Sequence, residues 1–145
     1  MRIAARVSHV TGAQHEVNVQ TAGPERRLDV AAKSDGGSTV NGGEFLMLAL
    51  ATCYCNDLYR EARRLGLVLD AVEVVAEAEF DGVGLAARDV RYRARVESNA
   101  GEAAIEQLLR ETDAVAEVHN TLRVGTAVRR EPWRVSGGRP SDRPA

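Results

Sequence analysis

The feature that most constrains the fold is a long apolar segment near the middle of the chain. From Glu44 to Leu65 there is no glycine or proline, which predicts one long helix that ends at Gly66. Its first half, FLMLALATCYC, is apolar around the whole circumference, and its second half, NDLYREARRLG, is amphipathic. A helix that is apolar on every side has to be buried on every side. One small sheet cannot supply that much cover.

Alternating apolar residues predict strands before and after this helix. RIAARVSHV and HEVNVQT precede it with a turn at Gly12, and a short third strand is expected around Leu28 to Ala31. A loop with four glycines, residues 33–44, then leads into the helix. AVEVVAEAEF and DVRYRARVE follow it and predict a hairpin over residues 71–97, in which glutamates of one strand face arginines of the other.

The C-terminal third predicts further helices and a closing strand. Asn99 with Glu102 three residues later resembles a helix start, and Asp113 is a candidate cap for a second short helix. A last strand is expected over residues 123–128. We expect one domain over residues 1–130. Residues 131–145 are rich in proline, glycine and arginine and are expected to form a flexible tail.

Composition excludes several partners. The 145 residues carry a formal net charge of -2, which gives no electrostatic reason to expect nucleic acid or an anionic membrane. No run of about 18 apolar residues predicts a transmembrane helix. The start, MRIAARVSHVTG, lacks the apolar stretch of a signal peptide. We therefore expect a cytoplasmic protein whose thiols are kept reduced.

The two cysteines of the chain, Cys53 and Cys55, lie within the apolar segment. Residues two apart on a helix point about 200° apart, so the pair is poorly arranged for a disulfide within one chain. A buried cysteine often acts as a small hydrophobic residue, and a lowered thiol pKa at Cys53 would need an arginine or lysine from elsewhere in the fold. The Cys-x-Cys spacing lacks further zinc ligands, and the three histidines show no ligand-like spacing: His9, His15 and His119. No metal or organic cofactor is expected.

The succession of motifs resembles the OsmC/Ohr family of thiol peroxidases. The resemblance rests on the glycine-rich GGSTVNGGE, on FLMLALATC with the cysteine at residue 53, on ARRLGL, and on VEVVAEAEFDG. EVHNTLRVGTAV is similar to the segment that carries the second cysteine of the family. The resemblance implies an α+β fold with antiparallel sheets wrapped around long central helices in an intertwined homodimer.

The resemblance also implies a function and a set of site residues. Family members reduce organic hydroperoxides with a peroxidatic cysteine, which matches Cys53, activated by an arginine and a glutamate. Glu44 matches the widely shared glutamate at the helix start, where it orients that arginine or caps the helix, whereas Gly43 stands where the best-characterised peroxidases have their activating glutamate. The candidates for the arginine are Arg6, Arg26 and Arg27, and the sequence does not choose among them.

The second cysteine of the family is missing, because Ala116 stands in its place. Either an external thiol reductant resolves the oxidised Cys53, or Cys55 replaces the lost cysteine by approaching a cysteine of the other chain. The charged residues that follow, among them Asp57 and Arg60, are either a solvated helix face or part of a pocket. The alternative function is a non-catalytic OsmC-like protein that binds a small apolar or electrophilic ligand in the dimer cleft.

Overall fold

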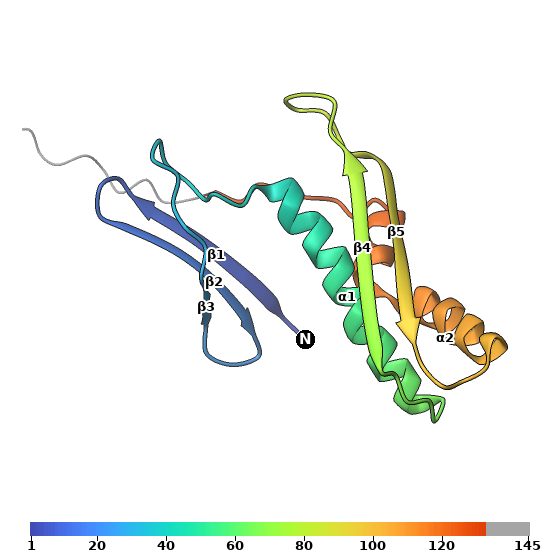
Figure 1. Cartoon of the computed structure of the whole chain (residues 1–145). Helices are drawn as coiled ribbons and strands as arrows, with labels where there is room; N and C mark the ends of the chain where they lie inside the picture. Colours follow the sequence, from blue (N-terminus) through green and yellow to red (C-terminus); the bar gives the residue numbers. More distant parts are fainter. Residues whose placement is uncertain (133–145) are drawn as a thin grey trace, which may run out of the picture.

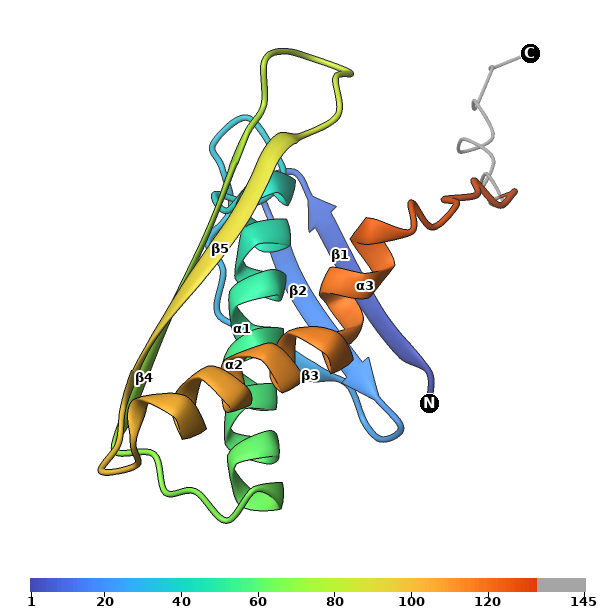
Figure 2. The same ribbon diagram turned by 90° about the vertical axis from the view of Figure 1, so that its right-hand side faces the viewer.

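The computed structural model describes residues 1–132 as two antiparallel sheets and three helices (Figures 1 and 2). The expected α+β class is confirmed. The elements, in chain order, are β1 (Ile3–Val10), β2 (Gln14–Thr21), β3 (Arg26–Leu28), α1 (Gly42–Arg64), β4 (Ala71–Glu79), β5 (Arg88–Glu97), α2 (Glu102–Val115) and α3 (Glu117–Arg123).

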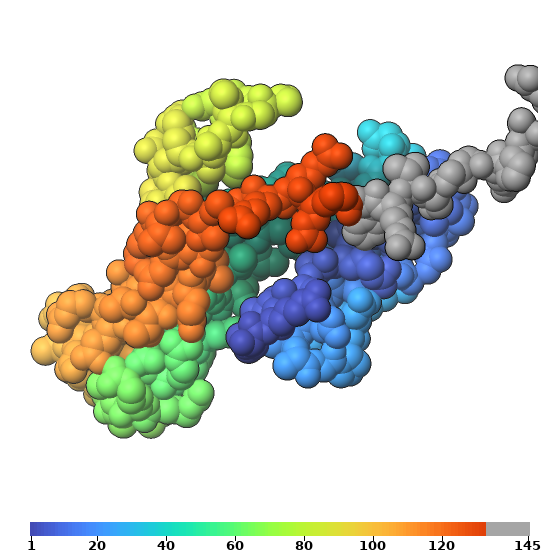
Figure 3. Space-filling view, turned by 180° about the vertical axis from the view of Figure 1, so that it is seen from behind, coloured from blue at the N-terminus to red at the C-terminus, as the bar shows by residue number. Residues whose placement is uncertain are grey.

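The N-terminal sheet has the order β1-β2-β3 and stands apart from the remaining elements. Its strands pack mainly against one another, and the space-filling view shows them as a separate blue lobe beside the green and orange body (Figure 3). The third strand lies earlier than expected, at Arg26–Leu28 instead of 28–31. Ile3 and Val7, four residues apart on one face of β1, are 67% and 57% exposed. This sheet therefore leaves apolar surface uncovered within the single chain.

The central helix α1 has the extent that the sequence predicts, with a defined cap at each end. The Asn41 side chain accepts from the backbone N–H of Glu44 at 3.0 Å, and the Glu44 carboxylate accepts from the backbone N–H of Asn41 at 2.7 Å. This reciprocal capping box satisfies two amides that the helix leaves free. At the other end Gly66 takes φ +69°, and the N–H of Leu67 donates to the carbonyl of Ala62. A left-handed residue of this kind ends a helix, and glycine adopts it at no steric cost.

Removing the N-terminal cap should lower stability measurably. We expect Asn41→Ala to reduce the free energy of unfolding by about 1 kcal/mol, because the Glu44 N–H loses its acceptor. Urea denaturation followed by circular dichroism measures the change. Asn41→Asp is the matched control and should stay close to the original protein, since aspartate caps equally well. An equal loss of stability in both variants would show that the loss does not come from the missing cap.

The expected hairpin is present as β4 and β5, with the expected charge pairing. Glu73 stands opposite Arg95, and Glu77 opposite Arg91. The Glu77 carboxylate forms ion pairs with Arg91 at 3.3 Å and Arg93 at 2.9 Å. The other face is apolar and packs on the core through Val72, Val74, Tyr92, Ala94 and Val96.

The core lies where one face of α1 meets this hairpin and α2, which crosses α1 in Figure 2. Tyr54, Leu58 and Ala62 follow one another along α1 and are at most 3% exposed. Leu108 of α2 is fully buried against them, and the Tyr54 hydroxyl donates to the carbonyl of Leu109 at 2.8 Å. These contacts hold α2 against α1, the helix that carries the cysteines.

The C-terminal elements differ from the sequence expectations in three places. The first residue before α2 is Gly101, without a side-chain cap, so Asn99 does not begin the helix. Asp113 lies inside α2, and the next helix begins after Ala116. The strand expected at 123–128 is wrong, because α3 continues to Arg123 and Gly125 turns the chain at φ +63°. The described residues beyond it form neither a strand nor a helix.

Complete burial of α1 is not reached within one chain. Within α1, Leu48 is 56% exposed and Tyr59 38% exposed. Among residues 1–132 no helix is long and apolar enough to span a lipid bilayer. Most of the expected flexible tail, residues 133–145, lies outside the described residues.

Candidate functional site

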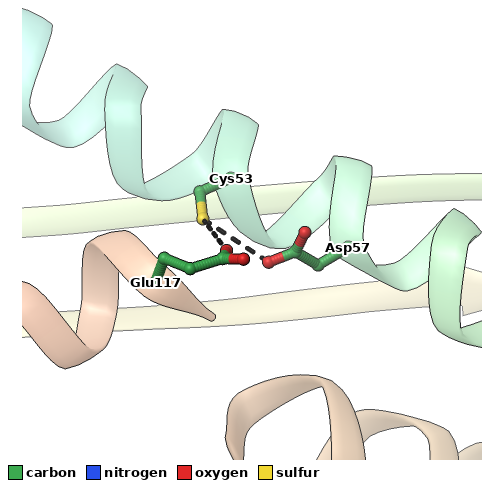
Figure 4. A group of neighbouring side chains, drawn as sticks. All are labelled: Cys53, Asp57 and Glu117. Atoms are coloured by element: carbon green, nitrogen blue, oxygen red, sulfur yellow. Dashed lines mark hydrogen bonds between the residues drawn. The ribbon is translucent and has the colours of Figure 1, made fainter. Parts of the chain in front are cut away.

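Cys53 lies at mid-length of α1, where the start of α3 passes beside it (Figure 4). Its thiol lies 3.5 Å from Oδ2 of Asp57, one turn further along the same helix. It lies 3.9 Å from Oε2 of Glu117, the first residue of α3. Two carboxylates from two helices therefore face one partly buried thiol. Each of them can accept a hydrogen bond from it.

Arg60 ties the two carboxylates together. Its Nη1 lies 2.6 Å from Oδ1 of Asp57 and 3.8 Å from Oε1 of Glu117, and its Nε donates to Glu61 at 3.1 Å. Asp57 is 4% exposed, so its carboxylate depends on this guanidinium for compensation. Asp57 and Arg60 thus lie next to the thiol, with the Asp57 side chain buried and that of Arg60 44% exposed.

The surroundings keep the thiol protonated. Burial raises the pKa of Cys53 above that of an ordinary cysteine, and the negative charges of Asp57 and Glu117 raise it further, while a backbone hydrogen bond from Val118 opposes them. Burial also raises the pKa of the Asp57 carboxyl, against the lowering effect of Arg60. At rest, the site holds a protonated thiol beside a carboxylate that accepts protons more readily than an exposed aspartate.

Removing one of the negative charges should make the thiol more reactive. In a Cys55→Ser background we expect Glu117→Gln to lower the pKa of Cys53 and to speed its alkylation at pH 7 about two- to fivefold. The effect is modest because Glu117 is 72% exposed and its charge is screened by water. Iodoacetamide modification followed by mass spectrometry across pH 6–10 measures it. Glu106→Gln, an exposed change on α2, is the control, and an unchanged rate in Glu117→Gln would contradict the expectation.

The segment that resembles the second-cysteine region is next to Cys53, as the resemblance implies. Ala116 is fully buried immediately before Glu117, so this position offers no thiol. Glu117 itself was not foreseen from the sequence. Its position directly after Ala116 is the signal that could have pointed to it.

The other predicted site residues do not contact Cys53 in the single chain. Glu44 caps α1. Arg6 belongs to the N-terminal sheet, where its guanidinium lies 2.9 Å from Glu25 and 3.7 Å from Glu16. Cys55 is a free thiol on the same regular helix as Cys53. The alternative arginines, Arg26 and Arg27, are in β3.

The cluster also has the atoms of a possible cation site. The thiol and one oxygen each of Asp57 and Glu117 lie within 4.8 Å of one another. The Arg60 guanidinium lies 2.6 Å from Asp57 and 3.8 Å from Glu117, so a metal ion bound by these carboxylates would have to compete with it. The arrangement is better suited to holding and moving a proton.

A cavity of about 230 Å³ lies between α1, β5 and α3. Its lining residues are Leu50, Val90, Tyr92, His119, Leu122 and Arg123. His119 is 3% exposed, and within the described residues neither of its ring nitrogens has a hydrogen-bond partner. Burial and the charge of Arg123 lower the pKa of His119, so the imidazole is neutral and offers one donor and one acceptor.

Comparison with known proteins identifies the family. The family model described as OsmC-like protein matches residues 34–131, more than half of the chain. The chain belongs to the OsmC-like protein family. No curated protein matches the chain.

Solved structures share the OsmC-like fold at low sequence identity. An OsmC-like protein from Mycoplasma pneumoniae is 17% identical, with a TM-score of 0.57 over 84% of this chain and 86% of its own. An organic hydroperoxide resistance protein OsmC from Legionella pneumophila is also 17% identical, with a TM-score of 0.57 over 85% and 90%. A hypothetical protein from Aquifex aeolicus VF5 is 13% identical, with a TM-score of 0.61 over 86% and 88%. At these identities the likeness supports the fold alone.

Proposed function

We propose that this OsmC-like protein reduces organic hydroperoxides, with Cys53 as the nucleophile. The observation that carries the proposal is the Cys53 thiol 3.5 Å from a buried carboxylate, Asp57, which Arg60 holds in position. Membership of the OsmC-like family supports it, as does the fold shared with a protein named for organic hydroperoxide resistance.

The proposed chemistry balances without a metal or an organic cofactor. As the thiol sulfur attacks the terminal oxygen of R–O–O–H, the thiol proton passes to Asp57, an S–O bond forms and the O–O bond breaks. The departing alkoxide takes a proton from Asp57 and leaves as the alcohol R–OH, and Cys53 becomes a sulfenic acid. Because the pKa of Cys53 is raised, proton transfer accompanies the attack, which is general base catalysis.

An external thiol is proposed to regenerate Cys53, since Ala116 offers no second cysteine. The first thiol molecule displaces water from the sulfenic acid and forms a mixed disulfide, and the second releases Cys53 as the thiol. The alternative, a disulfide that involves Cys55 of another chain, stays a prediction. α1 as a regular helix argues against a Cys53–Cys55 bond within one chain.

A cytoplasmic homodimer is part of the proposal. Two apolar surfaces of the single chain support the dimer: the face of β1 with Ile3 and Val7, and the side of α1 with Leu48. Large uncovered apolar surfaces are typical of interfaces. In such a dimer Arg6 of one chain can approach Cys53 of the other, where its charge would lower the pKa of the thiol.

The test is a single-turnover reaction of the reduced, full-length protein with one equivalent of cumene hydroperoxide. Intact-mass spectrometry with thiol trapping follows it. We expect rapid gain of one oxygen atom at Cys53 and release of one equivalent of alcohol. Oxidation no faster than that of a free thiol would overturn the proposal.

Ligand binding without catalysis is the second candidate, and the cavity beside His119 favours it. A buried neutral imidazole without a partner is costly unless a bound group satisfies it. The raised pKa of Cys53 also fits a thiol that is not a catalyst. Slow oxidation by hydroperoxide, together with saturable binding of small apolar alcohols or acids that His119→Phe abolishes, would favour this function over the peroxidase.

A further inference from the structure

His9 and His15 face each other across the first hairpin. Their spacing along the chain is unlike a metal motif, but the register of β1 and β2 pairs them directly. Their ring centroids are 5.5 Å apart, with the rings inclined by 61°. Strand pairing therefore brings together two of the three histidines of the chain, far from the Cys53 site in sequence.

One ring nitrogen of each of these histidines lacks a partner. Nδ1 of His9 and Nδ1 of His15 are both buried, and within the part of the chain that the structure describes neither has a hydrogen-bond partner. Buried polar atoms are satisfied in the great majority of cases, so two orphaned atoms on facing rings call for an explanation.

Ser38 completes an arrangement typical of metal-binding histidines. Its Oγ lies 3.0 Å from Nε2 of His15. When Nε2 carries the proton and donates it to this hydroxyl, Nδ1 presents its lone pair for coordination. Metal-bound histidines commonly use the second ring nitrogen in this way, which fixes the tautomer and the orientation of the ring.

The separation of the rings fits one shared ion. With metal–nitrogen bonds of about 2.0–2.1 Å at a tetrahedral angle, two coordinated imidazoles have centroids about 5 Å apart. The observed 5.5 Å is close to this separation. A cavity of about 450 Å³ is lined by both histidines, and it leaves room for an ion and its water ligands once the buried Nδ1 atoms turn toward it.

The lining of that cavity selects the kind of ion. Besides the histidines it includes Gln14, Lys33 and Ser34, and no carboxylate among the described residues. Ca²⁺ and Mg²⁺ prefer carboxylate and other oxygen ligands, whereas imidazole suits Zn²⁺, Cu²⁺ and Ni²⁺. We propose that His9 and His15 form a binding site for a divalent transition-metal ion at the end of the N-terminal hairpin, with water in the remaining coordination positions.

The experiment uses the full chain without an affinity tag, in a Cys53→Ser/Cys55→Ser background, which removes thiol chemistry and the thiol ligand of the cluster around Cys53. Titration calorimetry with Zn²⁺ and Cu²⁺ should give one ion per chain. The electron paramagnetic resonance spectrum of bound Cu²⁺ should show coupling to two nitrogens. The spectrum tests the proposal without any change at the histidines, so a spectrum with no nitrogen coupling would overturn it.

Variants locate the ion. We expect His9→Gln and His15→Gln each to weaken binding at least about tenfold, and Ser38→Ala to weaken it about tenfold through the loss of the hydrogen bond to His15. His119→Gln, the third histidine, should leave the affinity unchanged. Circular dichroism confirms that each variant is folded. Unchanged affinity in a folded His9→Gln/His15→Gln double variant, or absence of binding in the parent protein, would refute the site.

Discussion

Replacing Cys53 by serine should abolish the reaction with hydroperoxide. We expect the second-order rate constant for cumene hydroperoxide to fall at least about a thousandfold, because a serine hydroxyl is a far weaker nucleophile than a thiol at pH 7. The fold should survive, since Cys53 is only partly buried and serine has nearly its size. Stopped-flow or coupled alcohol release measures the rate, and thermal unfolding checks stability.

Cys55→Ser is the matched control for this experiment. It makes the same replacement of sulfur by oxygen two residues further along the same helix. The rate of the first oxidation should stay within about twofold of the original, since only Cys53 faces the carboxylates. The product distinguishes the resolution routes. A stable sulfenic acid or a mixed disulfide with added thiol fits the external reductant, and loss of an inter-chain disulfide in Cys55→Ser would support Cys55 as the partner. Equal loss of rate in both variants would contradict the assignment of Cys53.

The central helix and the second hairpin could be predicted from sequence because their signals are local. The segment from Glu44 to Leu65 lacks glycine and proline and is followed by Gly66, which fixes most of α1 by propensity and C-terminal capping. Alternation fixes β4 and β5. The end of the chain was harder, because 123–128 alternates weakly and a strand needs a neighbour to pair with. Here α3 continues through the start of that segment.

The site was predictable only in part, because its members come together through tertiary packing. Cys53 could be found from a motif, and Asp57 from its position one helical turn away. Glu117 lies 64 residues from Cys53, and only the crossing of α1 and α3 brings its carboxylate to the thiol. The same reasoning applies to His9 and His15, whose pairing depends on strand register. Whether Arg6 reaches Cys53 depends on a second chain, which the sequence of one chain does not position.

Replacing Asp57 by asparagine should slow the reaction with hydroperoxide about a hundredfold. Two effects of this change oppose each other. Loss of the negative charge lowers the pKa of Cys53 and favours the thiolate, which can raise the rate by at most about tenfold per pKa unit. Loss of the proton acceptor removes general base and acid catalysis, which contributes about 10²–10⁴-fold. The second effect is larger, so the net result is a slower reaction despite a more acidic thiol.

The comparison with Glu117→Gln makes this prediction decisive. That variant also removes one negative charge near the thiol, but it leaves the shorter contact to Asp57 intact. We therefore expect Glu117→Gln to react slightly faster with hydroperoxide, and Asp57→Asn to react much more slowly, although both show faster alkylation by iodoacetamide, which needs only the thiolate. If Asp57→Asn instead accelerates both reactions, Asp57 merely suppresses the thiolate. The activating group would then have to come from elsewhere, with Arg6 of a second chain as the leading candidate.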